Sequence, residues 1–329
     1  MKTQKGILVL LGKILLVGIP LVGLWLFAAF GKMYYLDGEA PNYLWLRKQL
    51  NTAHDGVEVV FIGDSAMNSA IDPSLMTDVN ALCLANGGGC PYDGYYMLKE
   101  YLEHNPTPKV VYYGYEYEHL EGTGSLWDRV LYTHLISYKD AMEMMHTMED
   151  RRHEWAFSGR PNAFRQVRSY YINYPGVYLP AMINAGFVGR HAANVEQWNT
   201  IEAHKGHYMA ITDDINPDYN EYMVYDFVVA DICDYYMRKT LDLCDSYGIT
   251  VRMIGIPTCP NTQFDVAYQD AQLAYMEDLA SNHPKVSYLP PTDTVEHDHF
   301  LDGHHLNNAG CAFFTNFLME TYPEDFHKE

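Results

Sequence analysis

The stretch Val57-Glu58-Val59-Val60-Phe61-Ile62-Gly63-Asp64-Ser65 decides the fold of this 329-residue chain. Its first six residues are mainly β-branched or aromatic, and a glycine follows, which is typical of a buried strand that ends in a tight turn. Further runs of this kind occur at residues 81–85, 109–115, 249–256 and 286–289, and helical patterns lie between them at residues 92–104, 226–247 and 267–281. Strands that alternate with helices predict an α/β fold with a mostly parallel five-stranded sheet covered on both faces.

The composition is that of a globular protein with a large core and an acidic surface. The chain is 48% hydrophobic and 19% charged, which excludes disordered and collagen-like classes. Its 42 acidic residues outnumber its 22 lysines and arginines, and the formal net charge is −20. A field of this sign repels phosphate groups, so we expect no nucleic-acid partner.

Residues 7–30 form an apolar run of 24 residues. As a helix they would span about 36 Å, which exceeds the roughly 30 Å of a bilayer core. We therefore expect residues 1–31 to be a short cytoplasmic tail and one transmembrane anchor in the lipid bilayer of the cell membrane. Lys2, Lys5 and Lys13 favour an amino end in the cytoplasm and an extracytoplasmic body. A cleavable signal peptide is the alternative, disfavoured because the run is long and lacks a small-x-small cleavage site.

Three regions are expected along the chain. After the anchor, residues 32–55 are a juxtamembrane connector with a short helix at residues 43–50. The α/β domain follows at residues 56–329. Within it, residues 116–225 carry helical and aromatic segments without a clear strand. This segment is predicted to be a large helical and irregular insertion that shapes a substrate site or a partner surface.

Six cysteines occur without any C-x-x-C pair, so neither a zinc knuckle nor a thioredoxin-type centre is indicated. An extracytoplasmic domain leaves room for up to three disulfides. We favour the alternative that residues such as Cys83 and Cys244 are buried thiols that pack like small hydrophobic side chains. A chain of this length is stable without cross-links.

Two motifs carry chemistry. Gly63-Asp64-Ser65 ends the first predicted strand, where a serine at a strand-to-helix turn displays its hydroxyl as a nucleophile. Asp302-Gly303-His304-His305 follows the last predicted strand and precedes an apolar helical run at residues 311–318. A serine needs an imidazole to take its proton, and the imidazole needs a carboxylate to fix its tautomer. We therefore expect Asp302 and His305 to meet Ser65 at one edge of the sheet.

Simpler explanations of these residues remain open. Ser65 also suits a turn-capping role. Asp150 and His153 have the same spacing as the second motif, but they lie in a charged run of the insertion. Residues 297–299 and the motif at residues 302–305 together contain four histidines and two aspartates in nine positions, so a metal site is a further possibility. We expect no metal and no other cofactor, because alternating histidines also suit a solvent-facing loop.

The two motifs resemble those of the SGNH or GDSL hydrolase superfamily, whose members are esterases, lipases and carbohydrate O-acyl hydrolases or transferases. The resemblance covers the sheet framework from residue 57 to residue 317 and leaves the insertion unexplained. It implies a flavodoxin-like three-layer sandwich in which Ser65 is the nucleophile, His305 the general base and then acid, and Asp302 its orienting carboxylate. The anchor and insertion resemble a membrane-tethered branch that includes the teichoic-acid D-alanylation protein and polysaccharide O-acyltransferase partners.

The resemblance also implies an oxyanion hole. The family's glycine after the second strand falls within Gly87-Gly88-Gly89, for which a flexible strand-to-helix loop is the alternative. The family's asparagine is not matched, because Gly114-Tyr115-Glu116 stands where its Gly-x-Asn-Asp pattern is expected. Asn86 and Asn68 are the candidate replacements.

Together these features predict a membrane-anchored serine esterase or O-acyltransferase that acts on acyl esters of a cell-envelope polymer through an acyl-serine intermediate. The implied substrate is an envelope polysaccharide or a teichoic-acid-like polymer. The implied partner is a membrane-embedded acyltransferase or a carrier protein. The alternative is a non-catalytic assembly or carrier-binding component of a complex that modifies envelope polymers, which the missing asparagine favours.

Overall fold

A five-stranded parallel sheet forms the centre of the computed structural model, which describes residues 2–53, 56–216, 221–292 and 295–327. The strand order is β2-β1-β3-β5-β7. These strands are β1 (Val59–Gly63), β2 (Ala81–Cys83), β3 (Val110–Gly114), β5 (Thr250–Ile254) and β7 (Val286–Leu289). All five predicted strands are confirmed to within two residues at each end. The order is that of a flavodoxin-like doubly wound sheet, which confirms the predicted fold class.

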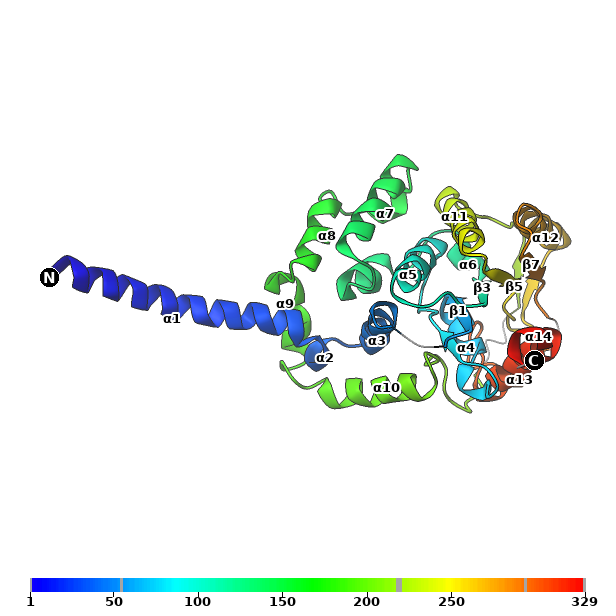
Figure 1. Cartoon of the computed structure of the whole chain (residues 1–329), viewed down its shortest axis with the longest axis horizontal. Helices are drawn as coiled ribbons and strands as arrows, with labels where there is room; N and C mark the ends of the chain where they lie inside the picture. The colour runs from blue at the N-terminus through cyan, green and yellow to red at the C-terminus, as the bar shows by residue number, and fades with distance from the viewer. Residues whose placement is uncertain (1, 54–55, 217–220, 293–294, 328–329) are drawn as a thin grey trace.

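Helices cover both faces of the sheet (Figure 1), and alternate residues of its strands belong to two separate hydrophobic cores. Val60 and Ile62 pack among α3 (Ala40–Asn51), α5 (Pro91–His104), α11 (Asp231–Tyr247) and α12 (Val266–Ser281). Val59 and Phe61 pack on the other face, among α4 (Ser65–Ala70), α13 (Asn308–Thr321) and α14 (Pro323–Phe326). Burial on both faces explains why the strands are nearly continuous hydrophobic runs in the sequence.

Strands β1 and β3 end on a pair of glycines. Gly63 lies opposite Gly114 in the parallel register. A Cβ atom on Gly63 would lie 2.1 Å from the carbonyl oxygen of Gly114, so no side chain fits there. This close approach brings together the two segments that leave the strands, which begin with Asp64 and with Tyr115.

Gly63→Ala is expected to lower the free energy of unfolding by at least about 1–3 kcal/mol, because the backbone oxygen it meets cannot move aside as a flexible side chain would. Urea denaturation of the detergent-solubilised protein measures this loss. Gly303→Ala is the matched control, since a Cβ at Gly303 meets no atom within 4 Å. Equal stability of the two variants would contradict the packing argument.

The insertion is mainly helical, as predicted, and lies between the sheet and the amino-terminal helix (Figure 1). Its elements are α6 (Tyr117–Leu120), the π-helical turn η2 (Leu126–Leu131), α7 (Tyr138–Asp150), η3 (Glu154–Phe157), α8 (Ala163–Tyr171), α9 (Pro175–Asn184) and α10 (His191–Ala203). The prediction that it holds no strand is wrong. β4 (Tyr222–Val224) pairs in parallel with β6 (Thr262–Phe264), and this short strand is too exposed to show an apolar pattern.

The amino-terminal helix α1 (Lys2–Phe30) projects from the body of the molecule (Figure 1). Its part Val9–Phe30 is long and apolar enough to cross a membrane. The connector that follows consists of α2 (Lys32–Tyr35) and α3. The last two residues of the expected connector, 54 and 55, lie outside the described residues, as does residue 1 of the expected tail.

The six cysteines, all within the described residues, are buried free thiols. Cys83 belongs to the core beneath α4 and α13, and Cys244 to the core on the opposite face of the sheet. Burial raises the pKa of each thiol to about 12. Both therefore pack as small hydrophobic groups.

Candidate functional site

Ser65 lies at the carboxyl edge of the sheet as the first residue of α4. Asp64 caps this helix, because its Oδ1 accepts hydrogen bonds from the backbone N–H groups of Ala66 and Met67 at 3.0 and 3.2 Å. Ser65 is 8% exposed, and its hydroxyl makes no hydrogen bond to any described residue. The side chain is therefore held at the turn by the backbone alone and keeps its hydroxyl free for other partners.

The other oxygen of Asp64 joins the ends of β1 and β3. It accepts the backbone N–H of Glu116 at 2.7 Å and lies 2.8 Å from Nδ1 of His119. Asp64 is fully buried, and burial alone would favour its neutral form. The His119 imidazole and the backbone donors outweigh burial and hold the pKa of Asp64 below its usual value. Asp64 is thus an ionised structural group.

Asp302 and His305 form the predicted pair. Nδ1 of His305 lies 2.8 Å from Oδ2 of Asp302 and 3.1 Å from Oδ1. Oδ1 also accepts the backbone N–H groups of His304 and His305, both at 2.8 Å. Burial opposes ionisation of Asp302, but these bonds lower its pKa to about 2. An ionised Asp302 favours the tautomer of His305 with its proton on Nδ1, which leaves Nε2 as an acceptor.

The loop that carries this pair docks on the helix that carries Ser65. The backbone N–H of Leu306 donates to Oγ of Ser69 at 3.2 Å. Ser69 lies one helical turn beyond Ser65 on the same face of α4. The three predicted catalytic residues therefore lie at one edge of the sheet. Nε2 of His305 is buried without a hydrogen bond among the described residues, so the Ser65–His305 hydrogen bond is not formed here.

Asn68 does not lie ready to donate to a substrate, contrary to expectation. Its Nδ2 donates to the carbonyls of Ala85 at 3.1 Å and Gly206 at 2.9 Å. Its Oδ1 accepts the N–H groups of Tyr208 and Met209 at 2.9 and 3.0 Å. The buried amide therefore fastens the returning end of the insertion to α4, and its hydrogen-bonding capacity is used up.

The other oxyanion candidates differ in availability. The N–H of Gly87 donates to the Tyr208 hydroxyl at 3.1 Å, and the N–H of Gly89 donates to the carbonyl of Asn86 at 3.0 Å. The N–H of Gly88 makes no hydrogen bond within the described part of the chain. Nδ2 of Asn86 is buried and has no hydrogen-bond partner among the residues that the structure describes. Gly88 and Asn86 are thus the two predicted candidates with a donor to spare.

Glu116 occupies the position at which the resemblance places an asparagine, and it pairs with His304. Nδ1 of His304 and Oε1 of Glu116 are hydrogen-bonded, and the Glu116 carboxylate is buried. The bond to Glu116 raises the pKa of His304 to about 9, so the imidazole is protonated at neutral pH. No local pattern in the sequence indicates this pair, because its two members are 188 residues apart.

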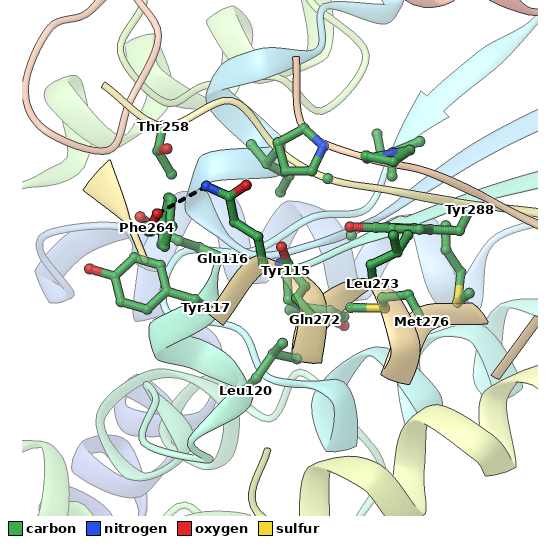
Figure 2. A pocket seen from close by; sticks show the side chains of 18 of the residues that line it. Tyr115, Glu116, Tyr117, Leu120, Thr258, Phe264, Gln272, Leu273, Met276 and Tyr288 are labelled. Carbon is green, nitrogen blue, oxygen red and sulfur yellow. Dashed lines mark hydrogen bonds between the residues drawn. The ribbon is translucent and has the colours of Figure 1, made fainter. Parts of the chain in front are cut away.

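A cavity of about 600 Å³ opens beside this pair, at the carboxyl ends of β3, β5 and β7 (Figure 2). Glu116 lines it together with aromatic and aliphatic side chains from α6, β6, α12 and β7, among them Tyr117, Phe264, Met276 and Tyr288. Ser65, Asp302 and His305 do not line it. The cavity therefore adjoins the candidate catalytic residues through Glu116.

The histidines near the second motif have separate polar neighbours. His297 is hydrogen-bonded to Asn261, His299 lies 3.0 Å from Asp298, and the other two pair with Glu116 and Asp302. Among the described residues, no group of three or more His, Cys, Asp or Glu side chains is arranged to hold a metal ion. The alternative pair of Asp150 and His153 lies at the end of α7, where His153 bonds to the carbonyl of Gly122.

No protein-family model matches the chain, and no curated protein matches it significantly.

Replacement of His304 is expected to change how stability depends on pH. The pKa of His304 is about 9 in the folded chain against 6.5 for a free side chain, so its pairing stabilises the fold fully below pH 6.5 and is lost as pH rises through 9. Urea midpoints of the wild type and His304→Gln should differ most near pH 6 and converge near pH 9.5. A difference that is constant across this range would show that the Glu116–His304 ion pair does not contribute.

Proposed function

We propose that the protein is a membrane-anchored serine esterase or O-acyltransferase that works through an acyl-Ser65 intermediate. The observation that carries the proposal is the Asp302–His305 pair, whose buried Nε2 lacks a partner at the edge where Ser65 begins α4. A buried polar atom without a hydrogen bond is costly, and such atoms concentrate where a reaction supplies the partner. We infer that Nε2 of His305 is kept without a partner because it accepts the proton of the Ser65 hydroxyl during the reaction.

The proposed reaction has two halves. As Oγ of Ser65 attacks the ester carbonyl, its proton passes to Nε2 of His305, and Asp302 stabilises the imidazolium. The imidazolium then protonates the departing alcohol, which leaves the acyl group on Ser65. In the second half, water or a polymer hydroxyl gives its proton to Nε2 and attacks the acyl-serine, and His305 then returns that proton to the departing Oγ of Ser65. The scheme requires Oγ of Ser65 and Nε2 of His305, which have no hydrogen-bond partner among the described residues, to come within hydrogen-bonding distance of each other.

His304 supplies the oxyanion donor that the missing asparagine would otherwise provide. Glu116 holds Nδ1 of His304, so the remaining N–H at Nε2 of the imidazolium is left to bind a developing negative charge. The backbone N–H of Glu116 is tied to Asp64, next to Ser65, and the rings of His304 and His305 lie 6.4 Å apart. A charged donor forms a stronger hydrogen bond than an amide does. The free N–H of Gly88 is the second donor in this scheme.

The location, the substrate and the partner of the protein are part of the same proposal. The anchor and the motif resemblance support an extracytoplasmic domain that acts on an envelope polysaccharide or a teichoic-acid-like polymer. They also support a membrane-embedded acyltransferase or a carrier protein as the partner.

The non-catalytic alternative is favoured by Glu116, which stands where the resemblance places an oxyanion-hole asparagine. In that case the protein assembles with, or presents a carrier to, an envelope-modifying complex. Reactivity of Ser65 separates the two functions.

An activated serine-reactive phosphonate is expected to label the full-length protein once, at Ser65, as located by mass spectrometry. Ser65→Ala should abolish labelling, and Asp302→Asn should slow it by roughly 10²–10⁴-fold because the imidazole loses its orienting carboxylate. Ser281→Ala is the matched control, since this exposed serine bonds only within its own helix end. A folded wild-type protein that stays unlabelled at Ser65 would favour the non-catalytic function.

His304→Ala is expected to lower kcat/KM for a soluble p-nitrophenyl ester by roughly 10²–10³-fold, the range for loss of one oxyanion donor. The double variant His304→Ala/Glu116→Gln should be little slower than His304→Ala, because the two residues act as one unit. His327→Gln is the control, as this exposed histidine pairs only with the exposed Asp78. Full activity in His304→Ala would remove His304 from the oxyanion site while leaving the role of Ser65 intact.

A further inference from the structure

One part of the insertion has a charge pattern opposite to that of the rest of the chain. Residues 155–195 contain four arginines and no aspartate or glutamate, although about one residue in eight of the whole chain is acidic. Within this window, residues 172–188 carry no ionisable acid, lysine, arginine or histidine. The window forms α8, α9 and the beginning of α10.

The uncharged segment exposes its large apolar side chains. Six of them are between 37% and 60% exposed, and we call them the α9 patch: Ile172, Tyr174, Leu179, Ile183, Phe187 and Val188. A soluble surface normally scatters such side chains singly, whereas a cluster marks a contact with another apolar phase. The arginines that border the segment include Arg165 and Arg168, both exposed on α8.

The α9 patch is fixed at a defined level of α1. Nε1 of Trp25 donates to the carbonyl of Ile172 at 3.0 Å, and the rings of Phe27 and Phe187 lie 6.1 Å apart. Beneath the patch, Tyr178 and Met182 of α9 are buried against the end of α1. Figure 1 shows α9 beside this end of the helix. Trp25 and Phe27 belong to the apolar part Val9–Phe30, so the patch lies alongside the last two turns of the candidate span.

We propose that the α9 patch is a second membrane contact, in which α9 and its flanking turns lie in the interface of the bilayer that α1 crosses. Trp25 lies five residues, or about 7.5 Å, before Phe30 along α1, so hydrocarbon or interfacial lipid surrounds α1 at the level of Ile172. An uncharged apolar surface suits that depth. Arg165 and Arg168, one to two turns before Ile172, suit anionic lipid headgroups.

In this proposal the α9 patch contacts bilayer lipid. This contact depends on α1 crossing the membrane, and it is independent of catalysis at Ser65. Two attachments, α1 and α9, would prevent the body from pivoting freely about the anchor. They would hold the carboxyl edge of the sheet at a fixed height above the bilayer.

The test places a fluorescent probe in the patch of the full-length protein. Ile183→Cys is labelled with bimane and the protein is reconstituted into vesicles of phosphatidylcholine and phosphatidylglycerol. Val266→Cys on α12 is the matched control, because Val266 is at least as exposed as Ile183 and Figure 1 shows α12 at the opposite end of the molecule from α1. The native cysteines are buried, so the new thiol is the site of labelling. Circular dichroism checks that both variants are folded.

Doxyl groups on the lipid chains should quench the Ile183 probe several-fold more than the Val266 probe, and aqueous iodide should show the reverse. Equal quenching of both probes by iodide would overturn the proposal. Protection of the Ile183 probe from both quenchers, with cross-linked dimers, would also overturn it in favour of a second copy of the chain. Alkaline carbonate extraction is measured first, because release from the vesicles would show that α1 itself is not inserted. Phosphonate labelling of the same samples reports on Ser65 separately.

Discussion

The buried carboxylate of Asp64 is the interaction on which the candidate site depends. Its two oxygens accept two N–H groups of α4, the N–H of Glu116 and the imidazole of His119. An ion in such a dry place is stable only when all its lone pairs are satisfied, and here they are. The same contacts cap the helix of Ser65 and join the ends of β1 and β3. The glycines at these strand ends make the contact possible, because any side chain would separate the two backbones.

Three carboxylate–imidazole pairs follow one another along this edge of the sheet: Asp64–His119, Glu116–His304 and Asp302–His305. Each carboxylate has its own imidazole, so three acidic groups can lie close together in a protein that is already strongly acidic. The pairs differ in what they leave unused. Both oxygens of Asp64 accept hydrogen bonds. Among the described residues, His304 has an N–H at Nε2 left to donate, and the buried Nε2 of His305 has no partner. A buried acceptor and a spare donor at the edge of the sheet where Ser65 begins α4 are the parts that the proposed acyl transfer requires.

The sheet and the pairing of Asp302 with His305 could be predicted from the sequence, because both depend on residues that are close together in the chain. A strand buried on both faces is apolar whatever its neighbours are, and residues three apart in a short loop meet without help from the rest of the fold. The Glu116–His304 pair and the engaged amide of Asn68 depend on contacts across 188 and 138 residues, which leave no local pattern. The strand β4 was missed for a similar reason, because its only signal is a partner strand beyond α11.

The insertion links the amino-terminal helix α1 to the candidate site. Its middle part packs on α1, and its last part returns to α4, where Nδ1 of His207 bonds to the carbonyl of Asn68 at 2.6 Å and His204 pairs with Asp72 at 2.7 Å. A single covalent segment therefore connects the level of Trp25 in the anchor to the helix that carries Ser65. This arrangement explains why the insertion lacks acids where it meets α1 and is rich in buried polar contacts where it meets α4. If α1 crosses a bilayer as proposed, the insertion sets the distance between that bilayer and Ser65.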